Sequence, residues 1–237
     1  MMNNISLPVK GGGDYRLHPT KIIALGLNYA DHIKESVSVK VKGFDPKVPE
    51  EPILFPKTPN VLIAHEEKII IPRFLKKYSF EDFRTDYEAE LAFIIKDTCK
   101  DVSEEDALNH ILGFTAMNDV SQRNIQNSDR SGWFRGKSFD TFGPIGPVLV
   151  STEKLPNYGN LDIRCRLNGK VVQDSNTKHM IFPVEKILSF ISKNFTLSEG
   201  DIIMTGTPSG VGPLSDGDVV EIEIEGIGTL RNPVEAG

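Results

Sequence analysis

Two glutamates, Glu88 and Glu90, stand at the start of an otherwise apolar stretch, DYEAELAFIIKD (86–97). Side chains in a strand alternate between its two faces, so residues two apart point the same way. Like charges on one face repel unless a cation compensates them, and Mg²⁺ binds a few carboxylates while it keeps several waters. The pattern is therefore typical of a divalent metal site, although a solvated strand face would also carry it.

Asp119 is a candidate third ligand for such a cation. It lies where the apolar run GFTAMNDVS (113–121) gives way to polar residues, and functional side chains are common where a regular element passes into a loop. An aspartate also suits a turn or a helix cap. The residues alone leave both interpretations open.

A histidine and a glutamate in HIKE (32–35) form a candidate general base. His32 and Glu35 are at positions i and i+3 of a predicted short helix, which places them on one face. A carboxylate beside an imidazole orients the ring and raises its basicity, so that it can act as a base near neutral pH. An ordinary surface pair has the same spacing.

Two further segments could face an anionic ligand. Arg123 and Gln126 in DVSQRNIQ are one helical turn apart, and a guanidinium binds a carboxylate through two hydrogen bonds. Lys137 in RGKSFD is a lone lysine, which is normally solvated but would stabilise negative charge developing nearby. The Gly-rich TGTPSGVG (205–212) lacks the GK[ST] of a P-loop, and its glycines suit tight turns.

Several of these motifs together resemble one family, the fumarylacetoacetate hydrolases. The likeness is carried by Glu88-x-Glu90, Asp119, GKSFDTFGPIGP (136–147), GDIIMTGTPSGVGP (200–213) and GLNYADHIKE (26–35). It extends over about residues 21–234 and is greatest to compact members close to acylpyruvate hydrolases and oxaloacetate decarboxylases.

The resemblance implies a mixed β-roll that forms a homodimer and binds Mg²⁺ or Mn²⁺, with Ca²⁺ as a further option. It implies metal ligands at Glu88, Glu90 and Asp119. It also implies that His32 and Glu35 belong to a lid, at about residues 28–51, which closes over the metal and activates water.

The resemblance implies roles for the remaining polar residues as well. Lys137 would stabilise negative charge on an enolate, while Arg123, Gln126 and Thr207 would bind the substrate, with Thr207 on its carboxylate. These roles predict a divalent-metal-dependent hydrolase or lyase that cleaves a C–C bond in an acylpyruvate-type 2-oxo acid through a metal-stabilised enolate. The substrate would be an acylpyruvate or a 2-oxo dicarboxylate.

Other functions stay open at this point. Within the family, the same site could serve a 2-hydroxyhepta-2,4-diene-1,7-dioate isomerase or an oxaloacetate decarboxylase or tautomerase. A non-catalytic metal or carboxylate binder is the alternative from another class. A plain structural module would leave the two same-face acids unexplained.

The elements that must position these residues are mostly strands. Strand patterns are found at 21–27, 52–57, 60–64, 68–72, 88–95, 113–121, 146–150, 161–169, 170–174, 201–206 and 218–234. Helical patterns are found at 28–36, 103–112 and 183–192. Strands outnumber helices without regular alternation, which predicts an α+β, mostly β chain with a few peripheral helices. Residues 1–20 are predicted to be an irregular lead-in and 21–237 a single catalytic domain.

Composition limits the class of protein. The 237 residues are 39% hydrophobic and 25% charged, a balance that allows a sizeable core. A net charge of −6 disfavours nucleic acid as a partner, and no apolar window of about 18 residues predicts a membrane span. The N-terminus lacks the layout of a signal peptide. Cys99 and Cys165 form no CxxC pair, which fits a reducing, cytoplasmic location.

Overall fold

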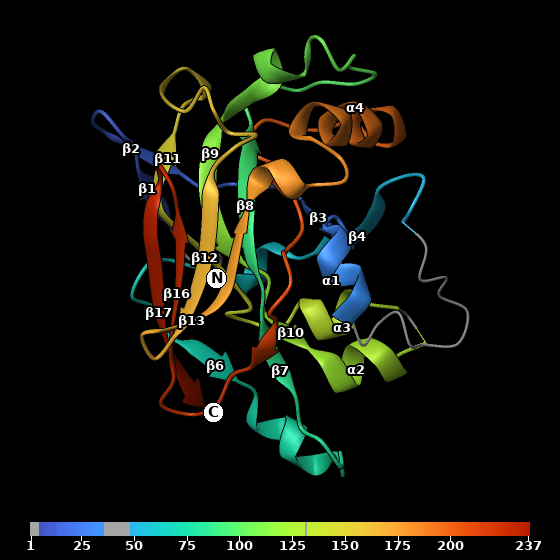
Figure 1. The fold of residues 1–237 in the computed structure, drawn as a ribbon, viewed down its shortest axis with the longest axis vertical. Coiled ribbons are helices and arrows are strands. Elements are labelled where there is room, and N and C mark those ends of the chain that lie inside the picture. The colour runs from blue at the N-terminus through green and yellow to red at the C-terminus, as the bar shows by residue number, and fades with distance from the viewer. Residues whose placement is uncertain (1–4, 36–47, 131) are drawn as a thin grey trace.

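A seven-stranded sheet forms the centre of the computed structural model, which describes residues 5–35, 48–130 and 132–237 (Figure 1). Its strands, in spatial order, are β4 (Ile53–Lys57), β3 (Ile22–Gly26), β14 (Ile202–Met204), β8 (Ala89–Ile95), β9 (Ile111–Asn118), β11 (Gly143–Val150) and β5 (Leu62–Ile63). Strands dominate the described chain, so the predicted mostly β class is confirmed.

Strand β8 lies in the middle of this sheet, and all of its residues are buried. Its alternate side chains enter two different cores. Leu91 and Phe93 pack in the larger core, whereas Ala92 and Ile94 pack in a second cluster on the opposite face. The apolar half of the opening stretch is therefore sheet interior, and Glu90 continues the face of Ala92.

A five-stranded sheet packs against the larger core. Its strands, in spatial order, are β13 (Lys170–Asn176), β12 (Asp162–Leu167), β16 (Val219–Ile224), β17 (Gly228–Ala236) and β6 (Ile69–Ile71). Strands β12 and β16 contact β8, and β16 and β17 contact β9. Strands β12 and β13 form a hairpin, and Asn168 and Gly169 between them have the positive φ angles, 52° and 79°, of a tight hairpin turn.

The predicted irregular lead-in is wrong for part of its length. Strands β1 (Ser6–Pro8) and β2 (Asp14–Arg16) pair as an antiparallel hairpin. Residues 11–13 are three successive glycines, and such a run in a sequence predicts a segment without regular secondary structure. In the structure their φ angles of 113°, 119° and 83° form the turn, because glycine tolerates this region without a steric cost.

Short elements complete the fold around one end of β8. A three-stranded sheet joins β10 (Ser121–Gln122), β7 (Thr85–Tyr87) and β15 (Gly212–Pro213). Helices α2 (Arg123–Ser128) and α3 (Phe134–Lys137) pack on each other, and α3 contacts β4. Helix α1 (Ala30–Glu35) lies on the same side (Figure 1). These pieces bring polar residues from distant parts of the sequence to the start of β8.

The remaining helix, α4 (Val184–Asn194), covers the other end with buried Ile187, Leu188 and Ile191, as its periodicity predicts. Isolated 3₁₀ turns are formed by Pro59–Val61, Arg73–Lys77, Ala107–His110, Thr152–Lys154 and Thr177–His179. The predicted helix at 103–112 is wrong. Only four of its residues are helical, because Ile111 pairs with Ile95 as the first residue of β9.

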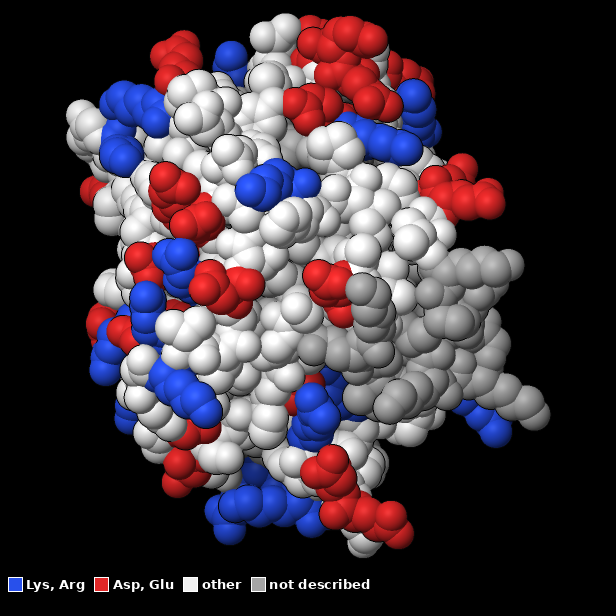
Figure 2. Space-filling model, viewed as in Figure 1, with Lys and Arg blue, Asp and Glu red and all other residues white. Residues whose placement is uncertain are grey.

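The described surface carries both signs of charge. Figure 2 shows acidic and basic side chains interspersed over this face, with acidic side chains gathered at its upper end. Among the described helices, none has the length and apolar character needed to span a membrane.

Candidate active site

The register of β8 and β9 brings the predicted acidic residues together. Ala89 lies opposite Asn118, so Glu88 and Asp119 are neighbours just beyond the paired strands. Two hydrogen bonds fix this end of the ladder: Asp119 N donates to Glu88 O at 2.9 Å, and Glu88 N donates to Asn118 Oδ1 at 2.9 Å. The strand-end position that singled out Asp119 therefore has a direct structural basis.

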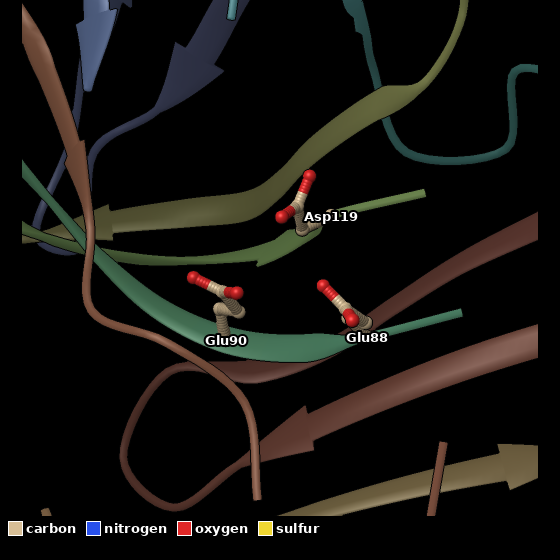
Figure 3. Close-up of side chains that lie close together, drawn as sticks. All are labelled: Glu88, Glu90 and Asp119. Carbon is tan, nitrogen blue, oxygen red and sulfur yellow. The ribbon is translucent and has the colours of Figure 1, made fainter. Parts of the chain in front are cut away.

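Three carboxylates share one small space (Figure 3). Ligand oxygens of Glu88, Glu90 and Asp119 all lie within 4.8 Å of one another. The three residues are 3%, 1% and 0% exposed, so water does little to screen their mutual repulsion. The interpretation of Glu88 and Glu90 as a solvated strand face is thereby excluded.

Two buried lysines compensate part of this charge. Lys137 Nζ lies 2.6 Å from both Glu88 Oε2 and Asp119 Oδ2. Lys57 Nζ, at the end of β4, lies 2.6 Å from the other oxygen of Asp119 and also donates to the carbonyl of Lys137. A lone lysine is usually solvated, but both of these ammonium groups belong to the site.

Arg123 joins the site to a second carboxylate behind it. Its Nε donates to Asp86 Oδ2 at 2.8 Å, its Nη2 donates to Glu88, and its Nη1 donates to Gln126 Oε1 at 3.0 Å. Arg84 approaches Asp86 from the outside, with Nε 2.8 Å from Oδ1. Arg123 and Gln126, one helical turn apart, therefore bind each other, and Asp86 supports the guanidinium from behind.

Neighbouring charges shift the pKa values of Glu88 and Glu90 in opposite directions. Burial alone would raise the pKa of Glu88, but Arg123 and Lys137 hold that pKa well below its usual range. Burial together with the charges of Asp119 and Glu88 raises the pKa of Glu90 well above its usual range. The compensation by Arg123 and Lys137 is thus concentrated on Glu88, and negative charge on Glu90 stays unfavourable.

A divalent cation fits this set of residues. All three candidate ligands offer carboxylate oxygen, which Mg²⁺ and Mn²⁺ prefer. The ammonium of Lys137 already bridges two of the three groups. A cation beside Glu90 would also offset the repulsion that raises its pKa. The triad could therefore hold a divalent metal ion.

A small pocket lies beside the carboxylates of Glu88 and Glu90. Most of the predicted site residues line it, namely His32, Glu88, Glu90, Arg123, Gln126, Lys137 and Thr207. Phe55 and Trp133 add apolar walls and meet edge to face, with ring centroids 5.3 Å apart. Charged groups on the floor and aromatic rings at the side suit a small organic anion.

The predicted lid is described only in part. His32 is 5% exposed and lines the pocket from α1. Glu35 ends the same helix, but its side chain lies outside the described part of the structure, as do residues 36–47. The orientation of His32 by Glu35 therefore stays a prediction.

Two buried side chains at the site escaped the sequence analysis. Lys57 closes the apolar strand ILFPK, where a lysine usually marks the solvated end of a strand. Gln173 lies in β13 and holds Thr207 through a hydrogen bond from Nε2 to Oγ1 of 2.9 Å. Only the pairing of the strands brings these residues to the site, so no local pattern identifies them.

Comparisons with known proteins agree with this arrangement. Residues 21–235 match the family model described as fumarylacetoacetate (FAA) hydrolase C-terminal. An uncharacterised protein of Archaeoglobus fulgidus is 49% identical over 90% of this chain and 78% of its own length. A protein of Xenopus laevis named as a mitochondrial oxaloacetate tautomerase is 42% identical over 92% of this chain and 66% of its own length.

Solved structures share the fold. Fumarylpyruvate hydrolase from Pseudomonas aeruginosa, in complex with Mn²⁺ and pyruvate, has a TM-score of 0.83 and 28% identity over 99% of this chain and 97% of its own. A 5-carboxymethyl-2-hydroxymuconate delta-isomerase from Mycobacterium smegmatis has a TM-score of 0.80 and 36% identity over 95% and 86%. The predicted type of β-roll is thereby confirmed. Because the family model covers nearly the whole chain, the chain belongs to the fumarylacetoacetate hydrolase family.

Proposed function

We propose that this chain is a divalent-metal-dependent enzyme that cleaves an acylpyruvate-type 2-oxo acid by hydrolysis of a C–C bond through an enolate. One observation carries the proposal: three buried carboxylates lie together, and two of them line a pocket with a buried arginine and a buried lysine. This combination suits an anionic substrate whose reaction develops further negative charge.

The acidic triad is the proposed metal site. Glu88, Glu90 and Asp119 would hold Mg²⁺ or Mn²⁺, which when bound would supply Lewis-acid polarisation of the 2-oxo group. The Mn²⁺ and pyruvate named in the structure of the Pseudomonas aeruginosa relative support both the metal and the type of ligand.

Binding of the substrate carboxylate is assigned to Arg123, Gln126 and Thr207, which line one pocket. Asp86 holds the Arg123 guanidinium through Nε, while Nη1 and Nη2 donate to Gln126 and Glu88, two residues that line the pocket. The pocket's small size favours an acid with a short 2-oxo end. The aromatic walls, Phe55 and Trp133, would exclude water from that end.

The proposed hydrolysis uses His32 as the base. His32 takes a proton from water while the water oxygen adds to the distal carbonyl carbon of the substrate. The C–C bond then breaks, its electron pair forms the enolate of pyruvate, and one acid is released. Lys137 stabilises the negative oxygen, and protonation at carbon yields pyruvate.

A second candidate reaction is tautomerisation of oxaloacetate. The 42% identity with the Xenopus laevis protein named as an oxaloacetate tautomerase favours it. The enolate of oxaloacetate itself would form by proton removal at C3 and would be protonated again on oxygen or carbon. No water is consumed and no C–C bond breaks, so the products separate the two reactions.

The decisive experiment is a screen of 2-oxo acids with Mg²⁺ or Mn²⁺, covering acetylpyruvate, fumarylpyruvate, oxaloacetate and a hydroxymuconate-type dioate. Release of pyruvate from an acylpyruvate supports hydrolysis, whereas enol–keto conversion of oxaloacetate without cleavage supports the tautomerase. Full turnover in EDTA would refute the role of the metal. The absence of turnover with every acid would favour a non-catalytic binder.

Variants of His32 test the general base. His32→Ala should slow acylpyruvate hydrolysis by about 100-fold or more and oxaloacetate decarboxylation far less, because only the first reaction activates water. His179→Ala is the matched control, since His179 is exposed and belongs to none of the motifs that carry the resemblance. Equal losses in both reactions would contradict a water-activating role.

A homodimer is proposed as the assembly. Exposed aromatic rings support it: Phe74, Tyr78 and Phe83 are 42%, 39% and 42% exposed, and Tyr78 stacks on Phe80. Rings of this size are rarely left in water together. Light scattering should give twice the chain mass of 26.3 kDa, and a monomer mass would reject the proposal.

A further inference from the structure

Gln173 is the one buried residue of β13, and its amide is fully engaged at the site. Its Oε1 accepts a hydrogen bond from Ala89 N at 3.0 Å. Its Nε2 donates to Thr207 Oγ1 and to Pro208 O, both at 2.9 Å. A backbone N–H can only donate and a carbonyl can only accept, so these partners fix which end of the amide is nitrogen.

The bond to Ala89 lies between the two glutamates of the triad. Strand β14 supports β8 as far as Leu91, whose carbonyl accepts from Thr205 N at 3.0 Å. Beyond that point β14 has ended, and Gln173 supplies the partner that a strand would otherwise give to Ala89. A side chain from the second sheet therefore continues the ladder at the start of β8.

The bond to Thr207 decides the direction of a hydroxyl group. Because Gln173 Nε2 donates to Oγ1, the Thr207 oxygen acts as the acceptor there. The hydroxyl proton must then point away from Gln173. Thr207 lines the pocket with Arg123 and Lys137, where an anion is expected. A hydroxyl held in this way is set to donate rather than to accept.

We propose that Gln173 is a positioning residue that holds the Thr207 hydroxyl as a hydrogen-bond donor to the carboxylate of the bound 2-oxo acid. The inference rests on the proposed function, because it takes a carboxylate as the ligand. Gln173 itself stays behind Thr207 and touches no substrate.

The test uses oxalate, a planar and unreactive stand-in for a 2-oxo acid, titrated calorimetrically into the Mn²⁺-loaded protein. Gln173→Leu and Thr207→Val should each weaken oxalate binding about ten-fold, since each removes the benefit of a hydrogen bond to a charged group. Mn²⁺ affinity without oxalate should change less than about three-fold, because no carboxylate of the triad is altered.

The double variant separates positioning from a merely structural role. If Gln173 acts through the hydroxyl, Gln173→Leu should weaken oxalate binding by less than about three-fold once Thr207→Val is present. A multiplied loss of about 100-fold, or full oxalate affinity in Gln173→Leu alone, would overturn the proposal. Should Gln173→Leu not fold, Gln173→Glu serves in the same cycle, because its oxygen would draw the hydroxyl proton toward itself.

Two controls keep the outcomes apart. Asp174→Asn alters the exposed neighbour on β13, which pairs with Arg164 at 2.9 Å, and should leave oxalate affinity unchanged. A wild-type protein that binds Mn²⁺ but not oxalate would refute the proposed function and this inference together. A wild-type protein that binds oxalate, with additive losses in the cycle, would refute only the role of Gln173.

Discussion

Lys57 and Asp119 form a completely buried ion pair, with Lys57 Nζ 2.6 Å from Asp119 Oδ1 and no exposure of either side chain. Burial lowers the pKa of Lys57, and the charge of Asp119 opposes that change. The same ammonium donates to the backbone carbonyl of Lys137. Lys57 therefore ties a candidate metal ligand to the backbone of the proposed active-site lysine from behind the pocket.

Replacement of Lys57 should destabilise the metal-free protein. Lys57→Met removes one partner of a buried pair and leaves Asp119 with less compensation, which should lower the free energy of unfolding by roughly 3 kcal/mol. Saturating Mn²⁺ should recover part of that loss, because a bound cation supplies the missing positive charge. Urea unfolding with and without Mn²⁺ measures both effects.

The control for Lys57→Met is Lys68→Met, which removes an exposed lysine that pairs with Glu235. This change should leave the unfolding curve the same within error, because exposed pairs contribute little. The role assigned to Lys57 is wrong if Lys57→Met and Lys68→Met have the same free energy of unfolding. It is also wrong if Mn²⁺ stabilises Lys57→Met no more than it stabilises wild type.

Glu90 should show a trade-off between stability and metal binding. Its charge is unfavourable beside Glu88 and Asp119, so Glu90→Gln should leave the metal-free protein equally stable or more stable by about 1 kcal/mol. The glutamine oxygen can still accept from Gly206 N, which donates to Glu90 Oε2 at 2.8 Å.

Metal titration reveals the other half of this trade-off. Wild type should gain about 2.7 kcal/mol at a metal concentration of 100 times Kd, and Glu90→Gln should gain almost nothing at that concentration. Thermal unfolding over a Mn²⁺ series measures this gain. An equal gain in both proteins would show that Glu90 is not a ligand.

The sequence predicts most of the polar floor of the pocket, for a physical reason. Glu88 and Glu90 share a face through strand alternation, and Arg123 and Gln126 meet through the helical repeat, with Nη1 3.0 Å from Oε1. Both relationships are local, so the spacing of the residues encodes them. The position of Asp119 follows from the end of its strand.

Lys57 and Gln173 could not be predicted in this way. Each reaches the site across a contact between distant segments: Lys57 meets Asp119, and Gln173 meets Ala89 and Thr207. Their burial depends on how β4 and β13 are placed, which no short motif specifies. The hairpin of β1 and β2 differs from the prediction for the opposite reason, because a local glycine run favours irregular chain in the sequence but forms a turn in the structure.

Asp201 should make stability depend on pH. Its buried carboxylate pairs with Lys21 Nζ at 2.5 Å and accepts from Thr20 N and Ser198 N, which links the chain before β3 to the start of β14. Burial alone would raise its pKa, but these partners hold the pKa below the ordinary value of 3.8. The carboxylate therefore stabilises the fold above pH 3.8, and this contribution is lost as the pH falls below it.

Asp201→Asn tests that dependence. The variant should be less stable by about 2 kcal/mol at pH 7, because hydrogen bonds to a charged group are weakened. The difference from wild type should shrink as the pH falls below 3.8. Urea unfolding across a pH series gives the comparison, and a gap that stays constant at acid pH would contradict the assignment.

The fluorescence of Trp133 should change when Gly26 is replaced, because the two residues touch in the wall of the pocket. A Cβ at Gly26 would lie 2.5 Å from Cζ3 of the Trp133 ring, well inside normal contact. Gly26→Ala should therefore displace the ring, at a cost of about 1–3 kcal/mol. Trp133 is the sole tryptophan of the chain, so its emission should shift without interference from any other. Oxalate affinity should fall while Mn²⁺ affinity is kept, because the ring forms a wall and not part of the triad.

Gly159→Ala is the matched control, since its added Cβ meets no atom within 4 Å. Unchanged emission and unchanged oxalate affinity in Gly26→Ala would show that the ring does not bound the binding site.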